Sequence, residues 1–274
     1  MRVDSHQHFW RLDRGDYDWL TSALAPIYRD FGPADLAPLL KKHGIGATVL
    51  VQAAATVAET EYMLQVAAAC DWVHGVVGWV DFDLPQAAAD IARLAQNPLL
   101  KSFRPMIQDI ADPHWILQPH LASPLAEIQR RDLAFDALLK PQHLLPFQDF
   151  LKRYPKLRIV IDHGAKPAIS AGAFDPWAQQ MREIARDPRV FCKLSGLVTE
   201  AGSDWTEALL QPYFDLLLDA FGPARLMWGS DWPVVNLAGG YDRWHAAAST
   251  LIDSLSVAEQ DAVLGQTATS FYRL

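Results

Sequence analysis

Eight short apolar runs rich in β-branched residues alternate along the chain with longer stretches of helical periodicity. We expect strands at 2–6, 47–53, 73–80, 100–104, 135–139, 158–163, 190–195 and 225–230. Strands that are apolar throughout are typical of a parallel sheet, whose connections are helices. Eight is the number of strands that closes a TIM-type barrel. The pattern therefore predicts an α/β protein with the (β/α)8 architecture.

A helical segment follows each predicted strand. We expect helices at 33–43, 57–70, 84–95, 124–131, 144–154, 174–186, 207–221 and 241–255. Gly44 and the pair Gly222-Pro223 are typical of helix ends. The segments 10–32 and 105–123 have no clear period and are interpreted as long loops after strands one and four. Because the chain has 274 residues and no repeat or Gly/Ser linker, residues 1–274 are expected to form a single domain.

Charge and composition argue against several classes of partner. The net charge is −8 and no run of Lys and Arg is present, so we expect no nucleic-acid partner. No window approaches the roughly 18 apolar residues of a membrane span, and the first residues lack a signal peptide. Cys70 and Cys192 lie in no metal or redox motif. We expect a cytoplasmic protein with buried thiols, and the sequence does not indicate its oligomeric state.

Five predicted strands end in ionisable residues. Catalytic groups of a (β/α)8 barrel lie at the carboxyl ends of its strands, so these residues are expected to share one site. They are His6, His8, Arg104, His163, Lys193 and Asp231.

Each of these residues also has a structural interpretation. His6 and His8 lie two apart on one side of a strand, where they could converge on a metal or a water, or could simply be a hydrogen-bonded pair. Asp231 could be a helix N-cap. His163 could be a core histidine, with Asp162 as its outward-facing neighbour. It is the combination of these residues at the ends of strands one, six and eight that favours a catalytic site.

The remaining candidates are substrate-binding residues. Because a cation in an apolar barrel strand is costly unless it meets an anion or a solvated pocket, Arg104 and Lys193 could bind substrate or pair with a structural carboxylate. The ring of Trp232 could pack on a ring-shaped ligand. Three further candidates in the 105–123 loop are His114, Trp115 and His120.

Five motifs carry a family resemblance that spans nearly the whole chain. They are Val-Asp-Ser-His-Gln-His-Phe-Trp at 3–10, Val-Val-Gly-Trp-Val-Asp at 76–81, Ile-Asp-His-Gly-Ala-Lys-Pro at 161–167, Lys-Leu-Ser-Gly-Leu at 193–197 and Gly-Ser-Asp-Trp-Pro at 229–233. They resemble the amidohydrolase superfamily. Within it the chain is similar to the sugar-lactone hydrolases of the L-fuconolactone and L-rhamnonolactone type, relatives of 2-pyrone-4,6-dicarboxylate lactonase.

The resemblance implies hydrolysis of a small sugar lactone to the sugar acid. Asp231 would take a proton from the attacking water and return it to the ring oxygen. The residues that would orient the water and the carbonyl are His6, His8 and His163. The residues that would contact the substrate are Arg104, Lys193 and Trp232.

The predicted strand five departs from the metal-dependent members of the superfamily. It reads Phe-Asp-Ala-Leu-Leu at 135–139 and supplies no histidine. Lys140 follows it and could be a carboxylated bridge or a solvated side chain. We therefore expect no binuclear zinc site and no required cofactor, although His6, His8 and Asp231 could hold one divalent ion such as zinc.

Two alternative functions stay open at this point. The first is a metal-dependent hydrolase or decarboxylase of an aromatic acid, since such enzymes share the barrel and the His-x-His motif. The second is a barrel without catalytic activity that binds a sugar acid.

Overall fold

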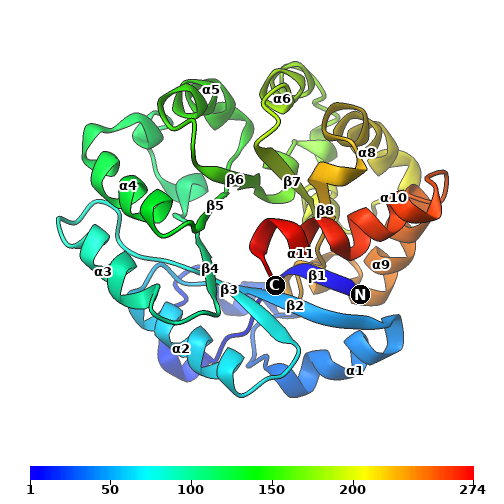
Figure 1. The fold of residues 1–274 in the computed structure, drawn as a ribbon. Helices are drawn as coiled ribbons and strands as arrows, with labels where there is room; N and C mark the ends of the chain where they lie inside the picture. The colour runs from blue at the N-terminus through cyan, green and yellow to red at the C-terminus, as the bar shows by residue number, and fades with distance from the viewer.

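The computed structural model describes residues 1–274 and contains one sheet of eight parallel strands, in chain order from β1 to β8. The strands are β1 (Arg2–Gln7), β2 (Ile45–Val51), β3 (Val73–Gly78), β4 (Leu100–Phe103), β5 (Ala134–Ala137), β6 (Arg158–Ile161), β7 (Val190–Leu194) and β8 (Leu226–Trp228). A parallel bridge between Gln7 and Trp232 joins the chain after β8 to β1. The predicted (β/α)8 barrel is confirmed (Figure 1).

The chain forms eleven α-helices, most of which surround this barrel (Figure 1). They are α1 (Pro33–His43), α2 (Val57–Ala68), α3 (Ala87–Leu94), α4 (Ala122–Arg130), α5 (Leu144–Arg153), α6 (Trp177–Ala185), α7 (Leu197–Ala201), α8 (Glu207–Phe221), α9 (Gly240–Leu251), α10 (Val257–Asp261) and α11 (Thr267–Tyr272). All eight predicted helices are present, and α1 and α8 have the predicted bounds. The short helices α7, α10 and α11 were not predicted.

Helix α11 closes the amino-terminal end of the barrel. In Figure 1 it lies across the centre of the ring of strands, beside the amino terminus. Its residues Phe271 and Tyr272 pack against interior strand residues such as Val49, Val160 and Met227. Helix α11 does not cover the opposite end of the barrel, where the strands have their carboxyl ends. A functional site can therefore lie at that end.

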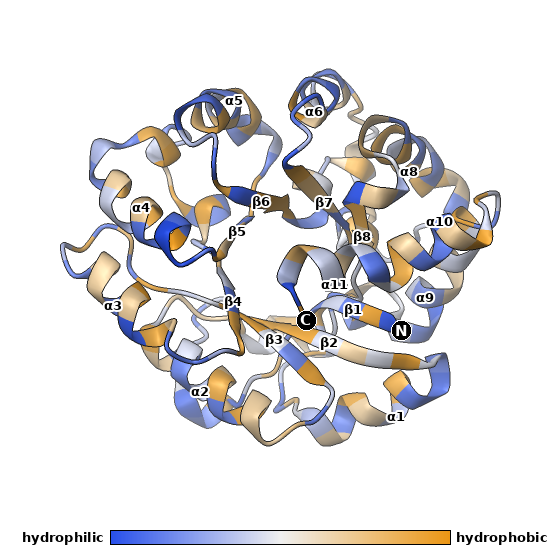
Figure 2. Cartoon of the chain, viewed as in Figure 1, coloured by the Kyte–Doolittle hydropathy of each residue, from blue (hydrophilic) through white to orange (hydrophobic).

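The surrounding helices pack apolar residues against the strands. On α6, for example, Trp177, Met181 and Ile184 are buried. Figure 2 shows the resulting mixture of hydrophobic and hydrophilic positions along each helix. Cys70 and Cys192 are buried and unpaired. No helix combines the length and the apolar composition needed to cross a membrane.

The two long loops predicted at 10–32 and 105–123 follow β1 and β4 and contain only short turns. The first loop is closed on itself by two backbone hydrogen bonds of 3.0 Å between Trp10 and Phe31. It is fastened to α2 by the buried carboxylate of Glu59, which accepts the Tyr17 hydroxyl at 2.8 Å and the backbone N–H of Ala53 at 3.2 Å. The loop is therefore held in place beside the strand ends.

Candidate active site

A cavity of about 310 Å³ opens at the carboxyl ends of the strands. Half of its fourteen lining residues are hydrophobic, and the others are polar or charged. Its lining residues are His8, Trp19, Leu24, Ala53, Arg104, Met106, Gln108, Asp109, Leu138, His163, Lys166, Asp231, Val234 and Leu237. Four of the residues predicted from the strand ends therefore face one cavity.

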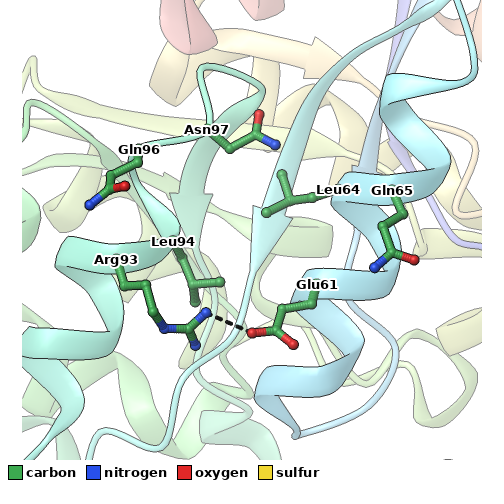
Figure 3. A pocket seen from close by; sticks show the side chains of 7 residues that line it. All are labelled: Glu61, Leu64, Gln65, Arg93, Leu94, Gln96 and Asn97. Carbon is green, nitrogen blue, oxygen red and sulfur yellow. Dashed lines mark hydrogen bonds and ion pairs between the residues drawn. The ribbon is translucent and has the colours of Figure 1, made fainter.

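A second hollow of about 460 Å³ lies between α2 and α3 on the outer ring of helices. Figure 3 shows the residues that line it. Arg93 Nη1 and Glu61 Oε1 form an ion pair of 2.7 Å across this hollow. It contains none of the candidate residues and lies away from the strand ends. The candidate active site is therefore the cavity at the strand ends.

His6 and His8 point to the same side of the chain at the end of β1, as their spacing predicted. Their Nε2 atoms are 3.1 Å apart. His8 lines the cavity, whereas His6 is fully buried behind it. The Nδ1 of His8 lies 2.8 Å from the backbone carbonyl of Val51. Because a carbonyl can only accept, this Nδ1 carries a proton and donates it.

Asp231 lies at the centre of the histidines. Its Oδ1 is 3.2 Å from His8 Nε2, 3.6 Å from His6 Nε2 and 3.9 Å from His163 Nε2. Burial raises the pKa of Asp231, but the neighbouring imidazoles outweigh burial and hold the pKa below its ordinary value. The carboxylate is therefore ionised at neutral pH.

The backbone at Asp231 has a left-handed conformation, with φ of 55°. Its N–H donates to the carbonyl of His6 at 2.8 Å. The preceding Ser230 donates its N–H to the buried carboxylate of Asp4 at 2.8 Å. Contacts with residues of β1 therefore hold the turn that directs Asp231 into the cavity. A left-handed backbone at a residue other than glycine is strained, and such strain is common at functional residues.

His163 also has a left-handed backbone, with φ of 55°. Its Nδ1 is 2.8 Å from the Ser195 hydroxyl. Gly196 passes so close that an added Cβ would lie 2.5 Å from His163 Nδ1, so this position requires glycine. Burial lowers the pKa of His163 to about 4, and the imidazole is neutral at neutral pH.

Arg104 lies at the end of β4 and lines the cavity. Its Nη1 donates to Asp162 Oδ2 at 3.1 Å, and its Nη2 donates to the carbonyl of Gln52. Its Nε makes no hydrogen bond within the protein. The guanidinium is therefore held rigidly and keeps a donor that the protein does not use.

Lys193, which the sequence placed among substrate contacts, does not line the cavity. Its side chain is fully buried beneath His6, and its Nζ lies 2.6 Å from Asp136 Oδ2, 3.0 Å from Asp162 Oδ1 and 3.1 Å from His6 Nδ1. Asp136 Oδ2 accepts a hydrogen bond from the ammonium, and Asp162 Oδ1 forms an ion pair with it. This placement supports a role under the site instead of a contact with substrate.

The interpretation of Asp162 as an outward-facing neighbour of His163 is wrong. Asp162 is fully buried and pairs with Arg104 and Lys193. Burial raises the pKa of its carboxyl, but the Lys193 charge and other neighbours bring it well below the ordinary value. The left-handed backbone at His163 breaks the alternation of the strand, so that both side chains point inward.

Asp136 is a buried carboxylate of β5 that sequence reasoning missed. It accepts Tyr272 OH from α11 and Ser102 Oγ from β4, each at 2.6 Å, in addition to Lys193. Its position in the middle of an apolar strand could have indicated a buried, paired aspartate. Its partner Tyr272 could not be predicted, because helix α11 was not predicted.

The other aromatic and loop candidates lie outside the cavity. Trp232 is 2 % exposed and packs edge-on against Phe9 and Phe31, while its carbonyl accepts the N–H of His8 at 2.7 Å. In the 105–123 loop, Trp115 Nε1 and His120 Nε2 each lie 2.7 Å from Asp83 Oδ1 and fasten the loop. His114 is exposed beside Asp112. Lys140 Nζ donates to the carbonyl of Gln108 at 3.0 Å.

Trp19 and Lys166 are among the cavity residues that the sequence analysis did not predict. Trp19 donates its Nε1 hydrogen to the carbonyl of Ala53 at 2.7 Å and is 38 % exposed, so one surface of its ring is open. Lys166 also lines the cavity, with its Nζ 3.5 Å from Glu200 Oε1. Trp19 lies in a loop without periodicity, so its position could not be predicted. Lys166 lies in the motif at 161–167, but nothing in the sequence indicates that its side chain lines the cavity.

Three residues of the site have donor atoms close enough together to share one metal ion. The donor atoms of His6, His163 and Asp231 lie within 4.8 Å of one another, a group in which His163 replaces the predicted His8. Burial and the Lys193 charge lower the pKa of His6 well below its ordinary value, so His6 is neutral and has one N–H. Both nitrogens of His6 face a cation, because Lys193 Nζ lies 3.1 Å from Nδ1 and Arg104 Nη1 lies 3.5 Å from Nε2. These two cations would repel a further positive ion. His6 therefore does not fit a metal ligand.

Comparisons with known proteins agree with this architecture. The amidohydrolase family model matches residues 3–274. The chain is 47 % identical to L-fucono-1,5-lactonase of Burkholderia ambifaria, over 100 % of this chain and 96 % of the relative. It is 38 % identical to L-fucono-1,5-lactonase of Burkholderia multivorans, with the same two coverages.

A solved structure is also similar over the full chain. It is a zinc-bound crystal structure of an amidohydrolase from Burkholderia multivorans, with a TM-score of 0.93 and 38 % identity, covering 100 % of this chain and 99 % of the neighbour. The family match and both lactonase relatives extend over the whole barrel. The chain therefore belongs to the amidohydrolase family.

Proposed function

We propose that this chain hydrolyses a sugar lactone, with L-fucono-1,5-lactone as the first substrate to test, and releases the sugar acid. The observation that carries the proposal is the ionised Asp231 at the cavity floor, surrounded by three histidines. The two full-length relatives that are L-fucono-1,5-lactonases support the choice of substrate.

Asp231 is suited to activate a water. Its Oδ1 faces the histidines, whereas no protein group hydrogen-bonds to Oδ2. A water at Oδ2 would lose a proton to the carboxylate as its oxygen attacks the lactone carbonyl carbon. The bond from that carbon to the ring oxygen then breaks, and Asp231 returns the proton to the ring oxygen. The product is the open hydroxy acid, which ionises in water.

Arg104 and His163 are placed to assist this reaction. As the carbonyl oxygen gains negative charge, the fixed guanidinium of Arg104 would stabilise it. His163 and His8 line the cavity on either side of Asp231 and would orient the water and the carbonyl. His6 is fully buried, so it would act by positioning His8 and Asp231.

This mechanism requires no cofactor. A lactone is an activated ester, so a carboxylate base and a cation at the carbonyl oxygen suffice. Zinc is bound in one solved neighbour, but both nitrogens of His6 in this chain face a cation. No step is therefore assigned to a metal.

The cavity walls fit a deoxysugar. Leu138, Val234 and Leu237 are apolar lining residues that would accept the C6 methyl group of a fuconolactone. Gln108, Asp109 and Lys166 offer polar groups to ring hydroxyls. The open surface of Trp19 would pack against a face of the sugar ring.

We also propose that the protein acts in the cytoplasm and has no nucleic-acid partner. The two unpaired cysteines suit a reducing compartment such as the cytoplasm. The net charge of −8 does not favour a nucleic-acid partner. Hydrolysis of a sugar lactone would serve carbohydrate catabolism.

A panel of sugar 1,5- and 1,4-lactones tests the proposal. Purified protein is added to each lactone, and acid release is followed with a pH indicator and corrected for spontaneous hydrolysis. We expect the highest kcat/KM on L-fucono-1,5-lactone and a lower value on the lactone that carries a hydroxyl at C6. Saturable binding without turnover on any lactone would contradict the proposal and favour a barrel that only binds sugar acids.

A further inference from the structure

Glu59 is a fully buried carboxyl group in the first turn of α2, and it does not line the cavity. Burial raises the pKa of Glu59 to about 7, which reflects the cost of an ionised group at this position. An apolar side chain of similar size would not carry that cost. What the carboxyl group adds over an apolar side chain is its hydrogen bonds.

The two oxygens of Glu59 contact two different segments of the chain. Oε2 accepts the Tyr17 hydroxyl at 2.8 Å, and Oε1 accepts the backbone N–H of Ala53 at 3.2 Å. Tyr17 belongs to the loop at 10–32, whereas Ala53 follows β2 and lines the cavity. Glu59 therefore joins this loop to the edge of the cavity.

The position of Trp19 depends on both of these contacts. Trp19 comes just after Tyr17 in the loop, and its Nε1 donates to the carbonyl of Ala53 at 2.7 Å. Its ring also packs edge-on against Trp10, with the ring centres 5.5 Å apart. Glu59 thus holds the chain that carries Trp19 and also the residue whose carbonyl binds the indole N–H.

Other contacts attach the same loop to α2. Arg14 Nη2 donates to Asp16 Oδ2 at 2.6 Å and lies 3.4 Å from Glu59 Oε2. Thr56, the N-cap of α2, donates its hydroxyl to Asp16 Oδ2 at 3.0 Å. None of these residues lines the cavity. We therefore expect the loop to stay attached when the Glu59 carboxyl group is removed, while the contact at the cavity loosens.

We propose that Glu59 is a positioning residue that holds Trp19 at the cavity, through Ala53 and Tyr17, and thereby sets the affinity for substrate. The part of this inference that concerns substrate rests on the proposed lactonase function. The part that concerns the hydrogen bond between Trp19 and Ala53 does not.

The test compares an apolar and a polar replacement of Glu59. Glu59→Leu removes both acceptors. Glu59→Gln is the matched control, because its amide oxygen can accept the N–H of Ala53 while its NH2 group donates to the Tyr17 hydroxyl oxygen. Trp19→Ala and the double variant Glu59→Leu/Trp19→Ala complete a double-mutant cycle. Tyr17→Phe removes only the contact with the loop and serves as a milder variant if Glu59→Leu does not fold.

Hydrogen exchange of the Trp19 indole N–H reports its bond to Ala53 directly. It is followed by NMR of protein labelled with 15N at tryptophan, with the Trp19 signal identified by its loss in Trp19→Phe. We expect exchange about fivefold faster in Glu59→Leu, the factor for one hydrogen bond, about twofold or more faster in Tyr17→Phe, and within about twofold of the wild type in Glu59→Gln. A wild-type rate in Glu59→Leu, or in Tyr17→Phe if the former does not fold, would overturn the proposal.

Steady-state kinetics on L-fucono-1,5-lactone separate positioning from general damage to the fold. We expect Glu59→Leu to raise KM about fivefold with kcat within about threefold, and Glu59→Gln to keep KM within about twofold of the wild type. The double variant should have the KM of Trp19→Ala, because Glu59 acts on substrate through Trp19. Effects that multiply in the double variant, or a fall in kcat at unchanged KM, would overturn the proposal. If the wild type turns over no lactone, the proposed function fails, and the exchange rates alone decide whether Glu59 positions Trp19.

Discussion

Replacement of Asp231 by asparagine removes the proposed base with little change of shape. Asparagine tolerates the left-handed backbone, with φ of 55°, that this position requires. Its amide oxygen can occupy the place of Asp231 Oδ1, 3.6 Å from His6 Nε2. We therefore expect the free energy of unfolding to change by at most about 2 kcal/mol, the value of one hydrogen bond to a charged group.

The effect on catalysis should be much larger. A positioned general base contributes about 10²- to 10⁴-fold, so kcat/KM should fall by that factor, equivalent to about 3 to 5 kcal/mol of barrier. The assay is hydrolysis of L-fucono-1,5-lactone followed by pH indicator, after mass spectrometry has excluded deamidation of the new asparagine. The loss should appear in kcat, since substrate would be bound mainly by other cavity residues.

Asp109→Asn is the matched control. Asp109 also lines the cavity, but it lies in the loop after β4 and forms no hydrogen bond or ion pair with the three histidines. Its replacement should leave kcat within about threefold of the wild type. The reasoning is refuted if Asp231→Asn keeps more than about a tenth of the wild-type kcat/KM, or if both variants lose activity equally.

Three further predictions address the surroundings of the site. Trp19→Ala should raise KM about fivefold with little change in kcat, because an aromatic face is worth about 1 kcal/mol; an unchanged KM in steady-state kinetics would remove Trp19 from the substrate site. Gly196→Ala should lower kcat about tenfold or more and lower the Tm, because the new Cβ would meet His163 Nδ1 at 2.5 Å; full activity would show that His163 can move without cost. Burial raises the pKa of Glu59 from 4.5 to about 7, so its contribution to stability is present below pH 4.5 and is lost as the pH rises through 7. Urea denaturation of Glu59→Gln should therefore show a gain over the wild type of about 3 kcal/mol between pH 4.5 and pH 8, and a pH-independent difference would contradict the assigned pKa.

Features with a regular period could be predicted from the sequence. The eight strands and the main helices follow from apolar runs and helical periodicity, and the observed bounds differ by a few residues. The side-by-side placement of His6 and His8 follows from the two-residue period of a strand and is seen in the 3.1 Å contact. The grouping of His8, His163 and Asp231 follows from the rule that strand carboxyl ends meet at one face.

Features that depend on depth in the barrel or on irregular backbone could not be predicted. Lys193 was recognised as unusual, but its height along the barrel axis depends on strand tilt, which places it beneath His6. Asp162 points inward because the chain turns left-handed at His163, where alternation no longer applies. Trp19 reaches the cavity from an aperiodic loop whose path is set by contacts such as that between Tyr17 and Glu59.

Turnover of L-fucono-1,5-lactone by metal-depleted protein tests the central claim most directly. The protein is treated with chelator, its residual metal is measured by mass spectrometry, and initial rates are recorded with and without added zinc. The account predicts that kcat/KM is retained in protein that contains far less than one metal ion per chain. Loss of turnover on depletion, with full recovery on adding zinc, would contradict it and make His6 a metal ligand.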